Sequence, residues 1–131
     1  MPRKKSYILT LTAEQDFREA KQWSLSRWGK DQTKQYFSDL NDGAEYIANN
    51  YQSIKDNDYL TANTGLGIYA VREHYMVYMP VEEKTIIIVA LIRQVRDVPA
   101  ILQANNYIIK RELEEIKKMI FEGKFSELAK K

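Results

Sequence analysis

The sequence predicts an α+β fold in which an antiparallel helical hairpin packs on a small, mostly antiparallel sheet. Three observations support this prediction. Apolar residues alternate with a period of two near the N-terminus. Two stretches whose apolar residues recur with the period of a helix lie on either side of Gly29. Three stretches rich in β-forming residues follow residue 67. A chain of 131 residues is long enough for one domain with a short appendage.

The first half of the chain predicts one strand and two helices. Alternation over Ser6–Leu11 indicates the strand. Thr12 and Gln15 have the spacing of a capping box, so we expect the first helix to begin at Thr12. Gly29 ends it, and a second apolar stripe predicts a helix over Asp31–Asn49. The tight stop between the helices predicts an antiparallel hairpin.

The middle of the chain predicts a loop and three strands. Residues 52–67 have no clear period and are rich in Asn, Asp, Thr and Gly. The strands are expected at Ile68–Arg72, Tyr75–Met79 and Thr85–Arg93. The last strand is apolar on both faces, which is typical of a central strand covered twice. Since each exposed side chain would cost roughly 1.5–3 kcal/mol, the face opposite the hairpin needs a cover, either the C-terminal segment or a partner chain.

The end of the chain predicts helix in two pieces. A helix is expected from Ala100 to about Asn105, after Pro99. A highly charged segment with a narrow apolar stripe follows it. We therefore divide the chain into a domain of residues 1–105 and an amphipathic helical extension of residues 106–131.

Composition excludes several classes of function. The formal net charge is +2, too weak to indicate nucleic-acid binding by itself. The chain has no cysteine and one histidine, so we expect no metal site and no cofactor. No stretch is apolar for long enough to span a membrane, and no apolar signal segment follows the basic N-terminus. We expect a cytoplasmic protein without a membrane partner.

A basic cluster marks the end of the last predicted strand. Arg93 and Arg96 flank this end and are followed by Asp97. One interpretation is contact with a target. The other is a solvated strand end with Arg96 paired to Asp97 or Glu73, an interaction worth about 0–1 kcal/mol.

The ordered motifs resemble the ParE branch of the RelE/ParE superfamily of type II toxin–antitoxin toxins, over about residues 7–102. The similarity consists of a strand followed by an alanine and an acidic residue, a tryptophan–glycine pair, a glutamine and an aromatic in the second helix, and a sheet motif that ends in arginine and aspartate. In this chain these are YILTLTAEQDF, Trp28-Gly29, DQTKQYFSDL, Gly67 with Arg72, His74 and YMVY, and LIRQVRD. The chain departs from the family where Arg93 replaces a frequent histidine, and where residues 106–131 extend past the usual end.

The resemblance implies a toxin that inhibits DNA gyrase by binding, without catalysis of its own, and acts in plasmid maintenance or stress response. It implies neutralisation by a ParD-like antitoxin in a hetero-oligomer, and no direct sequence-specific contact with nucleic acid. The residues implied for target binding are Arg72, Arg93, Arg96 and Asp97. Those implied for antitoxin binding are Tyr7, Leu9, Trp28, Tyr36 and Leu40.

Two other functions remain open from the sequence. A RelE-like ribosome-dependent messenger-RNA endonuclease would need acid–base side chains beside several cations. Its candidate residues are Arg72, His74, Arg93 and Arg96. The third function is a non-toxic paralogue that retains only antitoxin binding.

Overall fold

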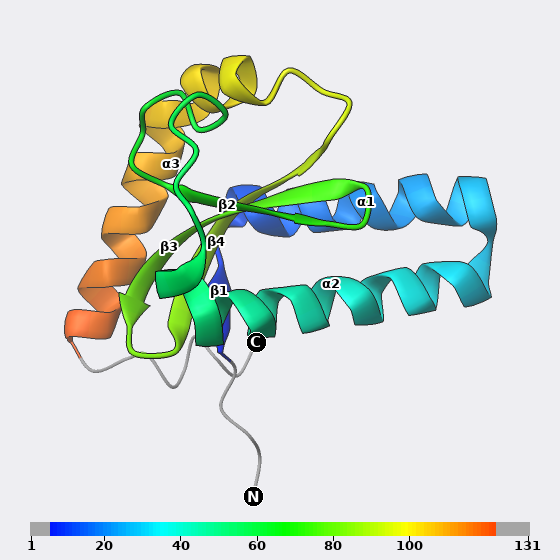
Figure 1. Cartoon of the computed structure of the whole chain (residues 1–131), viewed down its shortest axis with the longest axis horizontal. Helices are drawn as coiled ribbons and strands as arrows, with labels where there is room; N and C mark the ends of the chain where they lie inside the picture. Colours follow the sequence, from blue (N-terminus) through cyan, green and yellow to red (C-terminus); the bar gives the residue numbers. More distant parts are fainter. Residues whose placement is uncertain (1–5, 123–131) are drawn as a thin grey trace, which may run out of the picture.

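The computed structural model describes residues 6–122, and its helices and strands follow one another in the predicted order (Figure 1). A 3₁₀ turn, Tyr51–Ser53, follows the second helix. The strands and helices are β1 (Tyr7–Leu9), α1 (Leu11–Trp28), α2 (Lys30–Asn50), β2 (Gly67–Val71), β3 (His74–Glu82), β4 (Thr85–Arg93) and α3 (Val98–Phe121). The predicted α+β class with a helical hairpin and a C-terminal helical segment is confirmed.

The four strands form one sheet in the order β1-β4-β3-β2. β1 runs parallel to β4, and the two remaining pairs are antiparallel. The chain between β1 and β4 contains the helical hairpin, β2 and β3, and so provides the long connection that a parallel pair needs. β1 is short and pairs only with residues 86–88 of β4, so the second half of β4 extends beyond its neighbour on that side. This geometry shapes the candidate site described below.

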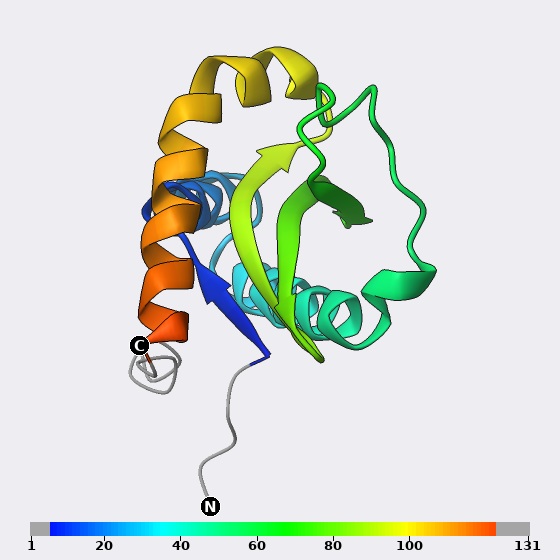
Figure 2. The same ribbon diagram turned by 90° about the vertical axis from the view of Figure 1, so that its left-hand side faces the viewer.

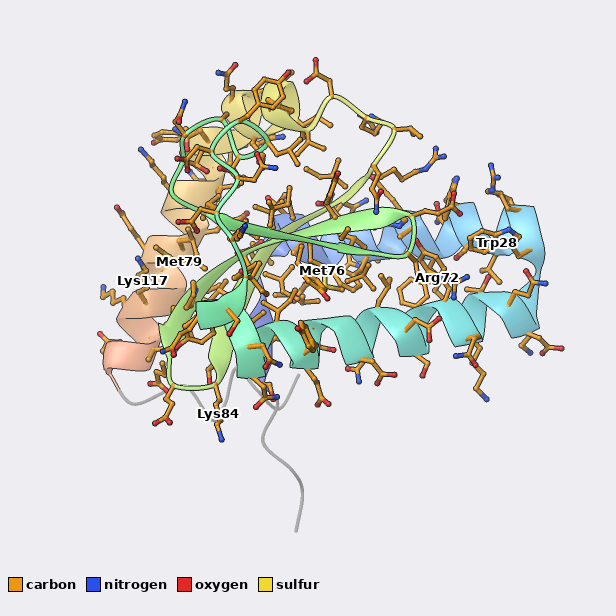
Figure 3. All side chains as sticks on the ribbon, viewed as in Figure 1. Trp28, Arg72, Met76, Met79, Lys84 and Lys117 are labelled. Carbon is orange, nitrogen blue, oxygen red and sulfur yellow. The ribbon has the colours of Figure 1, made fainter. Side chains whose placement is uncertain are left out.

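β4 lies between β1 and β3 in the interior of the sheet, and eight of its nine residues are buried. The helical hairpin covers one sheet face and α3 covers the other (Figures 1 and 2). Met76 lies between the sheet and the hairpin (Figure 3). The buried residues on the hairpin side include Tyr36, Leu40, Ile47, Met76, Ile86, Ile88 and Leu91. Those on the α3 side include Val77, Ile87, Val89, Ile92, Leu102, Ile109 and Leu113. Both faces of the doubly apolar strand are therefore sealed by the chain itself.

α3 differs from the two helical pieces that the sequence predicted. It is one continuous helix of 24 residues, so the expected helix end near Asn105 is wrong. The two adjacent asparagines interrupt the apolar pattern, but Leu102 and Ile109 lie on the same buried face. The predicted boundary between residues 105 and 106 lies inside this helix, and residues 123–131 of the predicted extension lie outside the described part. Of the two expected covers for the sheet, the C-terminal segment is the one the structure has.

No helix in the described part of the chain has the length and apolar composition needed to cross a bilayer.

The start of α1 also differs from the prediction. Thr10, rather than Thr12, is the N-cap, and its hydroxyl oxygen accepts a hydrogen bond from the Ala13 N–H at 3.0 Å. The predicted capping box at Thr12 is wrong because the Thr12 N–H instead donates to Glu112 Oε1 of α3, at 3.1 Å. At the other end Gly29 stops α1 as expected, with a φ of 84° that favours glycine.

Substitution of the α3 core should reduce stability. Leu102 is fully buried, whereas Ile108 on the same helix is 41% exposed. We expect Leu102→Ala to lower the free energy of unfolding by about 2–5 kcal/mol, because it removes buried methyl groups and leaves a cavity. Ile108→Ala is the control and should change stability by less than about 1 kcal/mol. Urea unfolding followed by circular dichroism measures both, and a loss for Leu102→Ala as small as that of the control would contradict the contribution of α3 to the core.

Candidate functional site

The β2–β3 turn and the end of β4 meet at one end of the sheet. His74 is paired with Arg93 in the register of β3 and β4. The side-chain amide of Gln94 donates to the backbone carbonyls of Arg72 at 2.8 Å and of His74 at 3.3 Å. The backbone N–H of Gln94 donates to the Glu73 carbonyl at 3.0 Å. These contacts bring together three of the residues that the sequence singled out.

Arg72 is engaged within the protein. It lies at the tip of the hairpin turn with a φ of 56°, a conformation uncommon for a residue with a side chain. Its guanidinium forms a salt bridge with Asp39 of α2 and lies over the Tyr36 ring, 5.0 Å from the centroid. Figure 3 shows Arg72 between the turn and α2. Its charge is therefore partly used to hold the turn against the helical hairpin.

His74 is buried and neutral. Only 2% of its surface is exposed, and burial, assisted by the charge of Arg93, lowers its pKa from 6.5 to about 4. The Tyr36 hydroxyl lies 2.5 Å from Nδ1 of His74 and accepts the Glu73 N–H at 3.2 Å. The hydroxyl group therefore bridges the imidazole and the backbone of the turn. This arrangement stabilises the turn and fixes the orientation of the imidazole.

Arg93 packs on an aromatic cluster at the end of the sheet. Its guanidinium lies over the Trp23 ring, 4.6 Å from the centroid, and the Trp23 ring also packs edge-on against His74. The Arg93 Nε is buried and has no hydrogen-bond partner among the described residues. Arg27 lies on the same ring at 5.2 Å, so two arginines share Trp23. Such contacts are worth about 0.5–2 kcal/mol and hold Arg93 in a fixed orientation.

A cavity of about 410 Å³ lies where β1 no longer covers β4, between α1 and α3. His74, Arg93 and Arg96 line it, together with Asp16 and Glu19 of α1. These two carboxylates were not among the site residues predicted from the sequence. Asp16 lies one turn before Ala20 on the buried stripe of α1. An acidic residue on the buried side of a helix is the sequence feature that could have marked Asp16 as a candidate site residue.

The Asp16 carboxylate forms a hydrogen bond with the backbone of β4 where β1 does not pair with that strand. Its Oδ2 accepts the Leu91 N–H at 3.0 Å. Burial raises the pKa of the carboxyl group from 3.8 to about 6, the Leu91 hydrogen bond opposes this, and the nearby Glu19 adds to it. The cavity therefore combines an acid with a raised pKa, a neutral imidazole and two guanidinium groups.

The remaining predicted target residue has a structural contact. The Asp97 carboxylate caps α3 by accepting the Ala100 N–H at 3.2 Å. Arg96 is exposed, and within residues 6–122 neither Arg93 nor Arg96 forms an ion pair. The alternative reading, in which Arg96 pairs with Asp97 or Glu73, does not match this arrangement.

The predicted antitoxin-binding residues fall into two groups. Tyr36 and Leu40 are fully buried, and their side chains hold α2 against the sheet. Tyr7 and Leu9 line a second cavity of about 440 Å³ beside β1. Trp28 is half-buried near the tip of the helical hairpin (Figure 3). The structure thus leaves surface for contact at three of the five residues.

Removal of the Tyr36 hydroxyl should destabilise the end of the sheet. Tyr36→Phe leaves Nδ1 of His74 and the Glu73 N–H without their partner, and we expect a loss of about 1–3 kcal/mol in the free energy of unfolding. Tyr107→Phe, at a tyrosine 75% exposed, is the matched control and should be neutral. Urea unfolding tests the pair, and an unchanged stability of Tyr36→Phe would contradict the assigned hydrogen bonds.

Asp16 and His74 should give opposite dependences of stability on pH. The raised pKa of Asp16 favours the folded state below pH 3.8, and this contribution is lost as the pH rises through 6. The lowered pKa of His74 favours the folded state above pH 6.5, and this contribution is lost as the pH falls through 4. We expect urea midpoints of Asp16→Asn to rise more steeply than those of the wild type between pH 4 and 6. Parallel curves would show that Asp16 has an ordinary pKa.

Comparison with known proteins agrees with the fold and with these motifs. A search of curated proteins found no match. The family described as the ParE toxin of the type II toxin–antitoxin system parDE matches residues 7–98, well over half of the chain. The match includes β1, the helical hairpin, the three antiparallel strands and the basic end of β4, and stops where α3 begins. The chain therefore belongs to the ParE toxin family of type II toxin–antitoxin systems.

Proposed function

We propose that this toxin inhibits DNA gyrase by binding it through the basic end of β4, and that a ParD-like antitoxin neutralises it in a cytoplasmic hetero-oligomer. On this proposal the chain is an inhibitor without catalysis of its own. The target surface consists of Arg93 and Arg96, with Arg72 beside them. The observation that carries the proposal is the placement of this basic end within the part of the chain that matches the ParE family.

The two arginines differ in a way that suits binding. Arg93 is held against Trp23, whereas Arg96 is exposed after the strand and forms no ion pair with any described residue. A fixed cation next to an exposed one can meet an acidic surface without first breaking internal ion pairs. Charges arranged in this way contribute to the rate and specificity of association.

The environment of His74 supports binding rather than acid–base catalysis. A general base must reach the proton that it removes, directly or through one water molecule. His74 is 2% exposed, and its Nδ1 is already hydrogen-bonded to the Tyr36 hydroxyl. With a pKa near 4 the imidazole is also a weak base at neutral pH.

One observation favours the second candidate, a ribosome-dependent RNA endonuclease. Three of its four candidate residues, His74, Arg93 and Arg96, line the same cavity as Asp16. A carboxyl group with a pKa near 6 beside two cations is suited to proton transfer during phosphodiester cleavage. The two functions therefore make different demands on Asp16, which the endonuclease needs and the gyrase inhibitor does not.

Reversal of one exposed charge should separate the target surface from the rest of the molecule. We expect Arg96→Glu to raise the concentration needed to inhibit gyrase supercoiling by about tenfold or more. Lys117→Glu is the matched control, because Lys117 is exposed on α3 at the far end of the molecule from Arg72 (Figure 3). It should inhibit like the wild type. Both proteins should bind antitoxin normally.

The same proteins distinguish the alternatives. Supercoiling that survives excess wild-type toxin, together with cleavage of messenger RNA on translating ribosomes that Asp16→Asn abolishes, would establish the endonuclease. Absence of both activities, with normal growth on expression, would identify a non-toxic antitoxin-binding paralogue.

A further inference from the structure

The cavity beside β1, which we call the β1 groove, is lined partly by residues within the family match and partly by residues of α3 that follow it. It lies between β1, the helical hairpin and the second half of α3, and its volume is about 440 Å³. Leu9, Leu11 and Phe17 come from the part of the chain that matches the ParE family, whereas Glu115 and Met119 come from α3. The family match ends at residue 98, so one wall is built by sequence outside the match.

The groove lies against an open edge of the sheet. β1 is the terminal strand, and its other edge faces the groove rather than another described strand. An unpaired strand edge presents backbone N–H and C=O groups to which an extended segment can add. A segment paired with β1 directs alternate side chains toward the two layers that flank the sheet. One set meets the hairpin side and the other meets α3.

The two sides of the groove differ in chemistry. Phe17 and Phe37 make the hairpin side apolar, and Leu11 is 71% exposed at the groove. Glu112 and Glu115 lie on the α3 side. An exposed leucine beside aromatic side chains is typical of a contact surface, since water around it is released on binding.

Among residues 6–122, the charged side chains that line the groove are all acidic. They are Glu14, Glu112 and Glu115, and no lysine or arginine of the described part lines it. Glu14 is partly compensated by Arg18, at 3.7 Å, and Glu112 accepts the Thr12 N–H. Within the described part of the chain Glu115 is exposed and has neither an ion pair nor a hydrogen bond. Among the described residues, the groove thus contains one carboxylate without a partner next to apolar surface.

We propose that the β1 groove binds an extended segment of the antitoxin in which apolar residues alternate with lysine or arginine, and that the α3 wall selects the cognate antitoxin. The apolar residues pack on Leu11 and the phenylalanines, and the basic residues face Glu112 and Glu115. This inference rests on the proposed function, because it assigns the contact site and chemistry of the antitoxin partner.

Two neighbouring glutamates provide the test. Glu114 and Glu115 are consecutive exposed residues on α3, but only Glu115 lines the groove. Affinity is measured for a twelve-residue peptide that alternates leucine with lysine, and for the purified antitoxin, which is sought as the product of a short reading frame beside that of the toxin. We expect Glu115→Lys to weaken both by about tenfold and to reduce their dependence on salt, whereas Glu114→Lys changes neither.

The apolar side of the groove has its own matched pair. Leu11 and Val95 are exposed to similar extents, 71% and 77%. Leu11 lines the groove, whereas Val95 lies between Arg93 and Arg96, at the basic end of β4. We expect Leu11→Ser to weaken antitoxin binding by about tenfold and Val95→Ser to leave it unchanged.

The outcomes separate this inference from the function on which it rests. If the wild-type toxin does not bind the antitoxin, the proposed function fails. If it binds but Glu115→Lys and Glu114→Lys behave alike, only the groove assignment fails. If the toxin alone forms a dimer that Glu115→Lys dissociates, the occupant is a second copy. If a chain ending at Glu122 binds the peptide tenfold more tightly, residues 123–131 are the occupant; either result overturns the proposal.

Discussion

The burial of β4 on both faces is the constraint on which this structure depends. A strand of consecutive apolar residues can be central only if two layers cover it, and a chain of 131 residues has few segments with which to build them. The hairpin comes from the sequence before the strand and α3 from the sequence after it. Each layer also depends on the strand, because the apolar stripes of the helices would otherwise face water.

The polar end of the sheet follows from the same arrangement. Because β1 pairs with only three residues of β4, the Leu91 N–H has no strand partner on that side, and Asp16 takes its place. Burial of that carboxyl group and of His74 shifts their pKa values in opposite directions. The Trp23 ring then holds Arg93 beside His74. A short edge strand therefore leads to a cavity in which acidic, neutral and cationic groups lie close together.

Much of this architecture could be predicted from the sequence because local signals and tertiary packing agree. The bounds of β4 were predicted without error, since its apolar run ends abruptly at Arg93. Gly29 likewise marked the end of α1, because only a residue without a side chain readily adopts its conformation. Errors arose where a contact distant in sequence decided the structure. Glu112 takes the N–H at Thr12, and packing on the sheet carries α3 through two asparagines.

The candidate site was less accessible to sequence reasoning. Arg93 and Arg96 could be found from their place after a buried strand, but nothing local showed that Arg72 pairs with Asp39 or that Tyr36 holds His74. These contacts join residues more than thirty positions apart. Asp16 and Glu115 are ordinary helical acids in the sequence. Only the packing of α1 and α3 gives one of them a buried hydrogen bond and leaves the other facing a groove.

The two faces of α3 have separate structural roles. Ile109 and Leu113 face the sheet and can change little without loss of the core, whereas Glu115 faces away from it. Mutations on the outward face can accumulate in step with changes in a partner while the folded scaffold stays intact. Duplicated copies of such a gene in one genome can in this way become insulated from one another, each inactivated by its own antidote alone.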